Sequence, residues 1–253
     1  IMLMKSPYGW KKNAPEQYRK LAGQLDLDSE EPEQWKKAAD NMYIPYDREQ
    51  KLYLQDDGFL DRIPWPFDKI PADNYPLLLH YHPLVIYRHQ VCKQADLVLA
   101  LFLLSDKFDL EEKKRNYDFY EKVTTHDSSL STSIFSIVAS EIGYLDKAYE
   151  YFMYTARLDL DNIHGNTKDG IHAANMAGTW MCIINGFAGM RTNQGKLSFN
   201  PYLPEGWQEY SFKITYRGRM IEVTVNECGT YYRLLKGEAI SIIHKGEERL
   251  LTP

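Results

Sequence analysis

The sequence has 253 residues, of which 44% are hydrophobic and 13% aromatic, and its formal net charge is −5 at pH 7. This composition can bury a core, which excludes a globally disordered chain. The acidic balance, without a basic stripe or a long block of like charge, argues against nucleic acid as a partner. The apolar run at residues 95–104 is about half of a membrane span, so we expect a buried helix there and no membrane association.

Cysteine usage points to a reducing compartment. Cys92, Cys182 and Cys228 are far apart and odd in number. They form neither a disulfide framework nor a CxxC pair, so we expect a cytoplasmic protein. No signal peptide is visible, but the chain opens at Ile1 rather than Met, and we expect its true N-terminus to be missing.

The first elements are short. Helices are predicted at "PEQYRKLAGQ" and "EEPEQWKKAADNM", the second with Ser29 as its cap and Trp35 as its core anchor. Residues 43–58 favour a short hairpin or an extended excursion. The following stretch, "DRIPWPFDKIPADNYP", has four prolines and predicts a long ordered loop of the kind that lines sites. We expect residues 62–83 to contribute to a site.

Regular helices are predicted to follow, joined by short loops as antiparallel hairpins. Ile134, Val138 and Ile142 share one face of the helix after "THDSSLS", and Gly143 is its expected terminator. The predicted helices span about 85–104, 110–122, 131–142, 146–158 and 170–186. The charged run "DLEEKKRNYDFYEK" within them is interpreted as a solvated helix face.

The pattern changes after Gly189. Apolar and polar residues alternate, and Gly218, Gly229, Gly237 and Gly246 punctuate the alternation, which is typical of an antiparallel sheet. The sequence therefore predicts an α+β chain with a helical domain at 1–190 and a C-terminal β-sheet domain at 191–253.

The stretch "THDSSLS" (125–131) gathers several hydroxyl groups where a helix is predicted to begin. If Ser128 and Ser129 open that helix, their backbone N–H groups and hydroxyls could hold a phosphate or sulfate at the positive end of the helix dipole. The alternative is an ordinary cap, with Asp127 or Ser128 capping and the other hydroxyls incidental.

Two more groups are candidates for binding. His172 stands at the start of a helix of small residues and could be a second arm on an anion, or a structural hydrogen-bonded histidine. Lys93 and Gln94 are predicted on an otherwise apolar helix, where a polyhydroxylated ligand could satisfy them. The alternative places both on the solvated edge of that helix.

Other chemistry has little support in the sequence. His80 and His82 resemble a metal pair, but no nearby ligand completes a usual set, so we expect no metal. Nucleophile-elbow, P-loop, dinucleotide-binding and HExxH motifs are absent. Paired acids such as Asp56 and Asp57 sit in turn contexts, and their spacing assigns them no acid or base role.

Five motifs, in their order and spacing, resemble the C-terminal part of the inverting α-glucoside phosphorylases of glycoside hydrolase family 65. These motifs are "KQADLVLALFLL", "NYDFYEKVTTHDSSLS", "AYEYFMYTARLDLDN", "TKDGIHAANMAGTW" and "GFAGMR…LSFNPYLPEGW". The resemblance is strong from about Gly58 to Trp207 and looser over the terminal sheet. It implies part of an (α/α)6 barrel followed by a small C-terminal antiparallel β-sheet domain.

The resemblance also implies a reaction and its residues. Family members cleave maltose, trehalose, kojibiose or nigerose with inorganic phosphate, without a further cofactor, and yield β-glucose 1-phosphate. By resemblance, Ser128, Ser129 and His172 would hold the attacking phosphate, and Lys93 and Gln94 would bind hydroxyls of the glucosyl unit. The family's general acid is a Glu in a DEY-type motif that nothing here matches. We therefore expect it upstream of Ile1, and we expect the isolated chain to be inactive.

Alternatives stay open at this stage. An α-glucoside hydrolase on the same scaffold would have no use for a phosphate cradle. A non-catalytic carbohydrate- or phosphate-binding module would keep the cradle without the acid. The sequence does not decide which linkage is cleaved, and a homodimer is possible for the full-length enzyme.

Overall fold

The computed structural model describes residues 11, 14–94 and 96–253. The chain forms two compact units, Ile1–Pro45 and Tyr46–Pro253, and each is described by itself. The beginning of the predicted helical domain, residues 1–10, lies outside the described residues, as do residues 12, 13 and 95.

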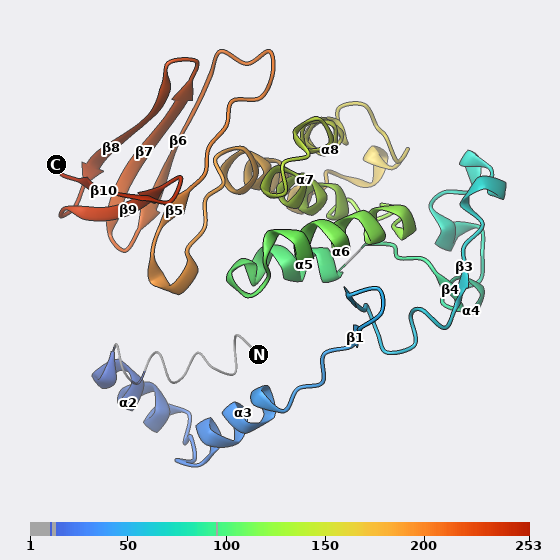
Figure 1. Ribbon diagram of the computed structural model, residues 1–253, viewed down its shortest axis with the longest axis horizontal. Helices are drawn as coiled ribbons and strands as arrows, with labels where there is room; N and C mark the ends of the chain where they lie inside the picture. The colour runs from blue at the N-terminus through green and yellow to red at the C-terminus, as the bar shows by residue number, and fades with distance from the viewer. Residues whose placement is uncertain (1–10, 12–13, 95) are drawn as a thin grey trace. The chain divides into compact units, whose positions relative to one another are not determined.

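The described part of the first unit is a pair of short helices, α2 (Pro15–Gln24) and α3 (Glu31–Asp40) (Figure 1). Both predicted helices are confirmed, and each carries a proline in its first turn, where the missing N–H costs nothing. The predicted cap at Ser29 is wrong: Glu30 holds the N-cap position without a side-chain cap bond. Asp28 accepts a hydrogen bond from the Glu30 N–H instead, and this turn moves the helix start downstream.

The predicted core anchor of α3 is also wrong. Trp35 is only half-buried, whereas Ala39 is the buried residue of this helix.

The second unit opens with the predicted hairpin, formed by β1 (Tyr46–Asp47) and β2 (Leu52–Tyr53). The proline-rich segment follows as an ordered irregular stretch, as predicted. It contains β3 (Ile63–Pro64) and three single 3₁₀ turns, at Phe67–Lys69, Ala72–Asn74 and Leu77–Leu79. It has a small core of its own, made by Trp65, Leu77, Ile86 and Val91.

The single helix predicted at 85–104 is wrong. The structure divides this stretch into α4 (Pro83–Ile86), β4 (His89–Gln90) and α5 (Asp96–Leu103). The reason is backbone pairing: β4 pairs in parallel with β3, and the Cys92 N–H donates to the Val123 carbonyl at 2.7 Å. Backbone groups committed to other segments cannot form the i to i−4 bonds of a helix.

The next helices lie side by side in the second unit (Figure 1). The predictions for α6 (Leu110–Val123) and α8 (Leu145–Arg157) are confirmed, and α6 begins with a capping box between Asp109 and Glu112. Helix α7 (Ser131–Glu141) ends ahead of Gly143, whose φ of +84° suits the predicted terminator.

The last helix differs from its prediction at both ends. Helix α9 (Ala173–Met181) starts three residues late and continues into a wide π-helical turn, Cys182–Phe187. In this turn the Ala188 N–H reaches back to the Ile183 carbonyl at 2.8 Å. The π-turn places one more residue in the turn than an α-helix would.

Two glycines hold α7 and α9 together. A Cβ built on Gly178 would lie 2.7 Å from the Ser133 Oγ, and one on Gly186 would lie 3.2 Å from the Ser140 Oγ. Because Gly178 meets the start of α7 and Gly186 meets its end, α9 with its π-turn runs parallel to α7. The N-terminal ends of these two helices therefore point the same way.

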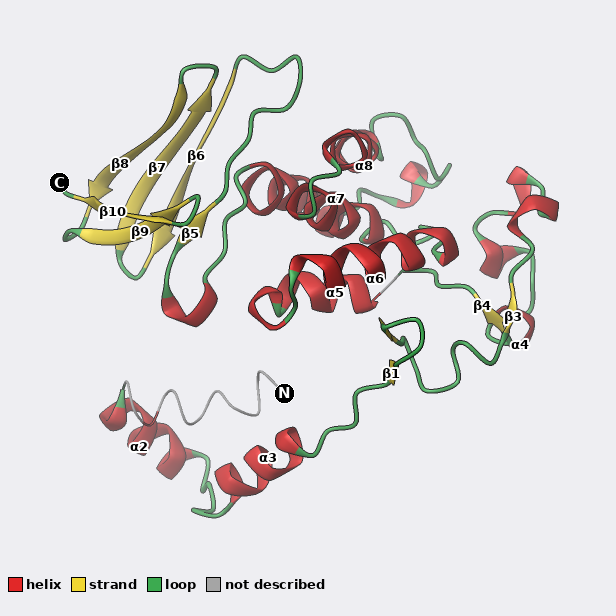
Figure 2. Ribbon diagram, viewed as in Figure 1, coloured by secondary structure: helices red, strands yellow, loops and turns green. Residues whose placement is uncertain are grey.

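Strands form the C-terminal part of the unit, next to the helices (Figure 2). The meander β6 (Glu209–Tyr216), β7 (Arg219–Asn226) and β8 (Gly229–Lys236) is antiparallel throughout, as predicted. A second sheet has the order β10 (Glu247–Leu251), β9 (Ile240–His244), β5 (Ser198–Phe199), and its β5–β9 pair is parallel. The hairpin turns at Arg217-Gly218 and Lys245-Gly246 have positive φ at both residues, as type I′ turns require.

The helices and strands share one core. Phe152 of α8 and Phe187 of the π-turn pack with Trp207 and with the inward residues of β7. Buried side chains from before and after the predicted domain boundary, between residues 190 and 191, therefore pack against each other. The boundary itself stays a prediction. Among the described helices, none is long and apolar enough to cross a membrane.

The close approach of α9 to α7 gives a stability prediction. Gly178→Ala places a methyl group against Ser133 and is expected to cost about 1–3 kcal/mol of unfolding free energy, because helix-to-helix packing has no room for it. The matched control is Gly58→Ala, where the nearest atom to an added Cβ is at 3.7 Å. Urea denaturation of both variants measures the difference, and equal stabilities would contradict the packing described here.

Candidate functional site

The predicted site residues lie ahead of three helices. Lys93 and Gln94 are in a bend before α5, Ser128 and Ser129 in a turn before α7, and His172 at the N-cap position of α9. The backbone joins the first two groups: the Thr125 N–H donates to the Cys92 carbonyl at 2.8 Å, and Cys92 bridges to Thr124 in parallel.

The start of α7 differs from its prediction. The helix begins at Ser131 with Leu130 at the N-cap and no side-chain cap bond, so neither Asp127 nor Ser128 caps it. The Ser131 N–H donates instead to the Ser128 carbonyl at 3.0 Å, which closes a separate turn ahead of the helix. Ser128 and Ser129 belong to this turn and do not open the helix.

The serine and threonine hydroxyls from Ser128 to Ser133 divide into two sets. Ser131, Thr132 and Ser133 are buried, and their hydroxyls bond to His126, Thr155 and the Leu130 carbonyl. Ser128 and Ser129 are partly exposed. The Ser128 Oγ accepts only a long bond of 3.4 Å from the Leu130 N–H. Among the described residues, the Ser129 hydroxyl and the N–H groups of Ser128 and Ser129 have no partner, so these donors are available to a ligand.

His126 anchors the turn of Ser128 and Ser129 to helices α7 and α8. It adopts a left-handed conformation with φ of +57°, and its Nδ1 lies 2.9 Å from the Ser131 Oγ and its Nε2 3.2 Å from the Tyr151 hydroxyl. Its ring packs edge-on against Phe135 at 4.7 Å. Burial lowers the pKa of His126 to about 4, so the ring is neutral near pH 7.

Asp127 connects the turn to the proline-rich segment. Its Oδ2 accepts a hydrogen bond from the Leu77 N–H at 2.8 Å. The carboxylate is therefore engaged with residues 62–83, and this contact brings the segment next to Ser128.

A carboxylate holds His172. Asp159 accepts from the His172 backbone N–H at 2.9 Å and lies 2.5 Å from its Nδ1, with both side chains about one-fifth exposed. The hydrogen bonds from His172 lower the pKa of Asp159, which therefore stays ionised. The other ring nitrogen, Nε2, has only a long contact of 3.4 Å with Asn166.

The turn before α7 and His172 lie at the same end of the helices. Thr155 hydrogen-bonds to Thr132 at the start of α7 and, through its carbonyl, to Asn175 in the first turns of α9. The pKa of His164 is consistent with this arrangement, because it responds to residues of both groups. Burial and the charge of His172 lower that pKa, and the charge of Asp127 raises it. The structure therefore brings these two groups to one end, although the role of each residue stays a prediction.

Lys93 and Gln94 are not on a helix, and their predicted placement is wrong. Lys93 is exposed, and the Gln94 Nε2 donates to the Asp96 Oδ1 at 3.1 Å ahead of α5. The bridge between Cys92 and Thr124 keeps the residues around Cys92 extended, so the helix begins only after Gln94. Both side chains remain at the end where Ser128 lies, in contact with solvent.

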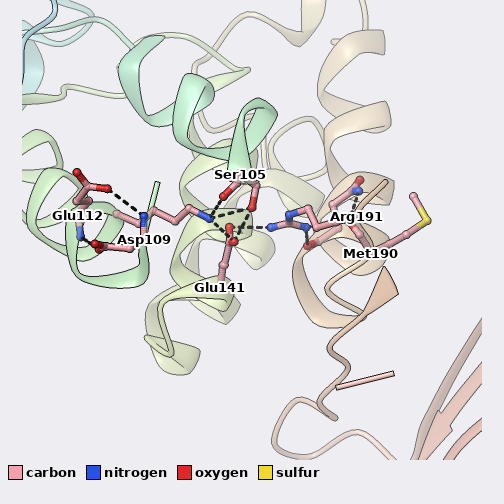
Figure 3. Close-up of polar contacts among 8 residues, drawn as sticks. Ser105, Asp109, Glu112, Glu141, Met190 and Arg191 are labelled. Carbon is pink, nitrogen blue, oxygen red and sulfur yellow. Dashed lines mark hydrogen bonds and ion pairs between the residues drawn. The ribbon is translucent and has the colours of Figure 1, made fainter. Parts of the chain in front are cut away.

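One polar cluster was missed by the sequence analysis. Lys113 of α6, Glu141 at the end of α7 and Arg191 after the π-turn form a continuous ion network, in which Glu141 faces Arg191 (Figure 3). The Lys113 Nζ also donates to the Ser105 carbonyl at 2.9 Å and the Ser105 Oγ at 2.8 Å. Burial alone would raise the pKa of Glu141, but the charges of Arg191 and Lys113 outweigh it and hold that pKa below its ordinary value.

The interpretation of "DLEEKKRNYDFYEK" as a solvated face was therefore wrong in part. Lys113 is 3% exposed and shares the buried face of α6 with Asn116, Tyr117 and Tyr120. Their spacing of three to four residues is the signal that could have identified the buried lysine.

Within the described residues, no group of three or more His, Cys, Asp or Glu side chains could hold a metal ion. His82 uses its Nδ1 to accept from the Leu84 N–H at the start of α4.

Comparison with known proteins gives two family matches. Residues 7–181 match the glycosyl hydrolase family 65 central catalytic domain, and residues 190–251 match the C-terminal domain of the same family. These matches confirm the predicted resemblance.

Individual relatives agree with the family matches. The chain is 55% identical to an α,α-trehalose phosphorylase of Geobacillus stearothermophilus, over 95% of this chain and 32% of the relative. It is 43% identical to a maltose phosphorylase of Bacillus subtilis, over 85% of this chain and 28% of the relative. The chain thus spans about a third of the length of the curated relatives it matches.

A solved structure agrees with the fold. A putative kojibiose phosphorylase from the human microbiome superposes with a TM-score of 0.82 at 33% identity, covering 92% of this chain and 31% of that one. The predicted fold class is confirmed: part of an (α/α)6 barrel followed by a small C-terminal β-sheet domain.

The neutral His126 predicts a loss of stability in acid. In the unfolded chain its pKa returns to about 6.5, so between pH 6.5 and about 4 the unfolded state binds more protons. The contribution is fully present above pH 6.5 and is lost as the pH falls towards 4, by on the order of 3 kcal/mol. Unfolding free energies measured by denaturant titration across this range should show the slope.

His126→Asn is the control for this slope. Asparagine tolerates the left-handed backbone at this position and does not titrate. We expect the variant to lose the part of the acid dependence that His126 contributes. An unchanged slope would show that His126 is not its source.

The buried network gives a second stability prediction. Glu141→Gln leaves the ammonium of Lys113 buried without a countercharge, and we expect a loss of about 3–5 kcal/mol. Glu121→Gln breaks an ion pair of the same length to Lys147, whose side chain is 47% exposed, and should cost less than about 1 kcal/mol. Thermal and denaturant unfolding compare the two variants, and equal losses would contradict the assigned burial.

Proposed function

The chain belongs to glycosyl hydrolase family 65, and on that premise we propose that it supplies the phosphate-binding end of a disaccharide phosphorylase. In the proposed reaction inorganic phosphate attacks the anomeric carbon of an α-glucoside from the face opposite the bond that breaks. The product is β-glucose 1-phosphate, and the second sugar leaves with a proton from a carboxylic acid.

The observation that carries the proposal is the convergence of two donor groups at one end of α7 and α9. The turn of Ser128 and Ser129 presents hydroxyls and N–H groups without partners, and His172 lies at the same end with its Nε2 only weakly engaged. Neutral hydrogen-bond donors and one imidazole can hold a phosphate dianion without neutralising its charge. The phosphate oxygen that attacks the anomeric carbon therefore stays nucleophilic. Asp159 keeps His172 oriented for this contact.

The glucosyl unit is assigned to the neighbouring bend. Lys93 and Gln94 lie ahead of α5, and the bridge between Cys92 and Thr124 joins them to the same end. Lysine offers donors, and glutamine both donors and an acceptor, which suits sugar hydroxyls. In this proposal no metal or organic cofactor takes part, and phosphate is a co-substrate.

The proposed disaccharide is α,α-trehalose. Identity to two trehalose phosphorylases is 55% and 53%, against 43% to the maltose phosphorylase and 38% to a kojibiose phosphorylase of Thermoanaerobacter brockii.

The proposal assigns the general acid to the part of the protein that these 253 residues do not include. The isolated chain is then expected to bind phosphate but to turn over no α-glucobiose. We place the protein in the cytoplasm, without nucleic acid or membrane partners, and allow a homodimer for the complete enzyme. Burial raises the pKa of Cys92 and of Cys182 to about 12, so both buried cysteines stay as thiols.

Binding of phosphate tests the cradle. We expect calorimetry on the 253-residue chain to show saturable binding of inorganic phosphate, weakened at least about tenfold by Ser128→Ala with Ser129→Ala and by His172→Ala. Ser211→Ala, at an exposed position on β6, is the matched control and should bind as the unmodified chain does. Affinity that is the same in all variants would remove the assigned cradle.

Activity separates phosphorolysis from its alternatives. A chimera in which this chain replaces the matching third of the Geobacillus stearothermophilus enzyme should release glucose from trehalose only when phosphate is present. His172→Ala in the chimera is expected to lower kcat/KM roughly 100-fold or more. Glucose release that ignores phosphate would indicate a hydrolase, and phosphate binding by a chimera without turnover would indicate a binding module.

A further inference from the structure

A cavity of about 610 Å³ lies at the other end of α7, where the helices meet the second sheet. Its walls come from the end of α7, the π-turn, the segment after it, and the strands β5 and β9. Ser140, Glu141 and Asn185 line the helical side, and Lys196, Ser198 and Lys245 line the side of the strands. The volume is in the range of sites that hold a small molecule.

This cavity is separate from the proposed phosphate cradle. The cradle lies ahead of the first residue of α7, and the cavity begins at its last two residues, Ser140 and Glu141. At 1.5 Å per residue, the 11 residues of α7 keep the two about 16 Å apart. The cavity is therefore a place distinct from the proposed cradle.

The cavity is positively charged although the chain as a whole is acidic. Arg191, Lys196 and Lys245 line it against one carboxylate, that of Glu141, so the lining carries a net charge of 3 − 1 = +2, while the chain carries −5. Glu141 is already bound by Arg191 and by Lys113 behind it. Within the described part of the chain neither Lys196 nor Lys245 has an ion-pair partner, and both are exposed. Like charges that line one cavity and exceed its carboxylates attract an anion.

The walls of the cavity are held in place before any ligand binds. The Arg191 Nη1 donates to the carbonyls of Asn185 and Met190 at 2.7 and 2.9 Å, and its Nη2 reaches Glu141 at 2.9 Å (Figure 3). The guanidinium also lies over the ring of Phe102, 4.9 Å from its centre. On the opposite wall, the Lys245 N–H donates to the Phe199 carbonyl at 2.9 Å, which ties the β9–β10 turn to β5. A fixed site loses less entropy on binding than a mobile one.

Neutral polar groups accompany the charges. Asn193, Gln194 and Asn200 add amides to the lining, and Ser198 adds a hydroxyl. Amides and hydroxyls alternate as donors and acceptors, the pattern that sugar hydroxyls need, whereas the lysines suit a phosphate group. The combination fits a ligand with both.

We propose that this cavity binds a small phosphorylated sugar, with its phosphate between Lys196 and Lys245 and its hydroxyls on the amide-lined wall. The site is additional to the cradle of Ser128, Ser129 and His172. It borders the Glu141–Arg191 pair, through which an occupant contacts both the end of α7 and the segment that leads to the sheet.

Glucose 6-phosphate is the probe, because it is not a product of the proposed reaction. We expect calorimetry on the 253-residue chain to show saturable binding in the micromolar to millimolar range, tighter than that of glucose. The double variant K196Q/K245Q should weaken it at least about tenfold, because each lysine contributes a charge-assisted contact. Circular dichroism should show the fold unchanged, since both side chains are exposed.

Two controls locate the ligand. K213Q/K236Q removes the same charge from the exposed outer strands β6 and β8 and should leave binding of glucose 6-phosphate unchanged. His172→Ala should also leave it unchanged, while it weakens the binding of inorganic phosphate. The proposal is overturned if the unmodified chain shows no saturation up to about 10 mM, if K196Q/K245Q binds normally, or if His172→Ala abolishes binding.

Discussion

The close contact between α7 and α9 is the constraint on which the rest of the second unit depends. Two glycines bring the helices together, because any side chain at Gly178 would overlap Ser133. The contact fixes the direction of α9 and its position along α7. As a result, the turn of Ser128 and Ser129 and the side chain of His172, some forty positions apart in the chain, lie at one end of the pair. The ion pair of Glu141 and Arg191 lies at the other end.

The two ends of this helical pair have different electrostatic characters. At one end the donors are hydroxyls, amide N–H groups and imidazoles, and carboxylates hold the imidazole and the loop in place. At the other end the cations of the cavity lining outnumber its single carboxylate.

Much of the fold follows from local patterns in the sequence. The spacing of apolar residues predicted α6 and α8 well, because these helices are amphipathic over several turns. The glycines between apolar stretches predicted the strand meander, because each hairpin turn has a glycine where φ is positive. Failures occurred where distant backbone pairing overrides local preference. The composition of residues 85–104 favours a helix, but Cys92 pairs with Thr124 ahead of α7. Nothing in the sequence near Cys92 indicates this distant partner.

The same distinction applies to the site. The cluster of hydroxyls in "THDSSLS" and the position of His172 could be recognised from the sequence, since both precede helices. Which hydroxyls stay without an internal partner could not be predicted, because that depends on His126 and Thr155, which bind the hydroxyls of Ser131 and Thr132 inside the helix packing. Lys113 was hidden for a related reason: its countercharges come from α7 and from the segment after α9.

The wide turn at Cys182–Phe187 has a consequence for protein engineering. It inserts an extra residue between the helix that bears His172 and the segment that bears Arg191. Deleting one residue there would remove the π-turn, in which the Ala188 N–H donates to the Ile183 carbonyl, and with it the backbone path that leads to Arg191 and its partner Glu141. A chimera that carries the C-terminal sheet on another (α/α)6 barrel should therefore be joined upstream of this turn. Helix α9, the π-turn and Arg191 then stay together.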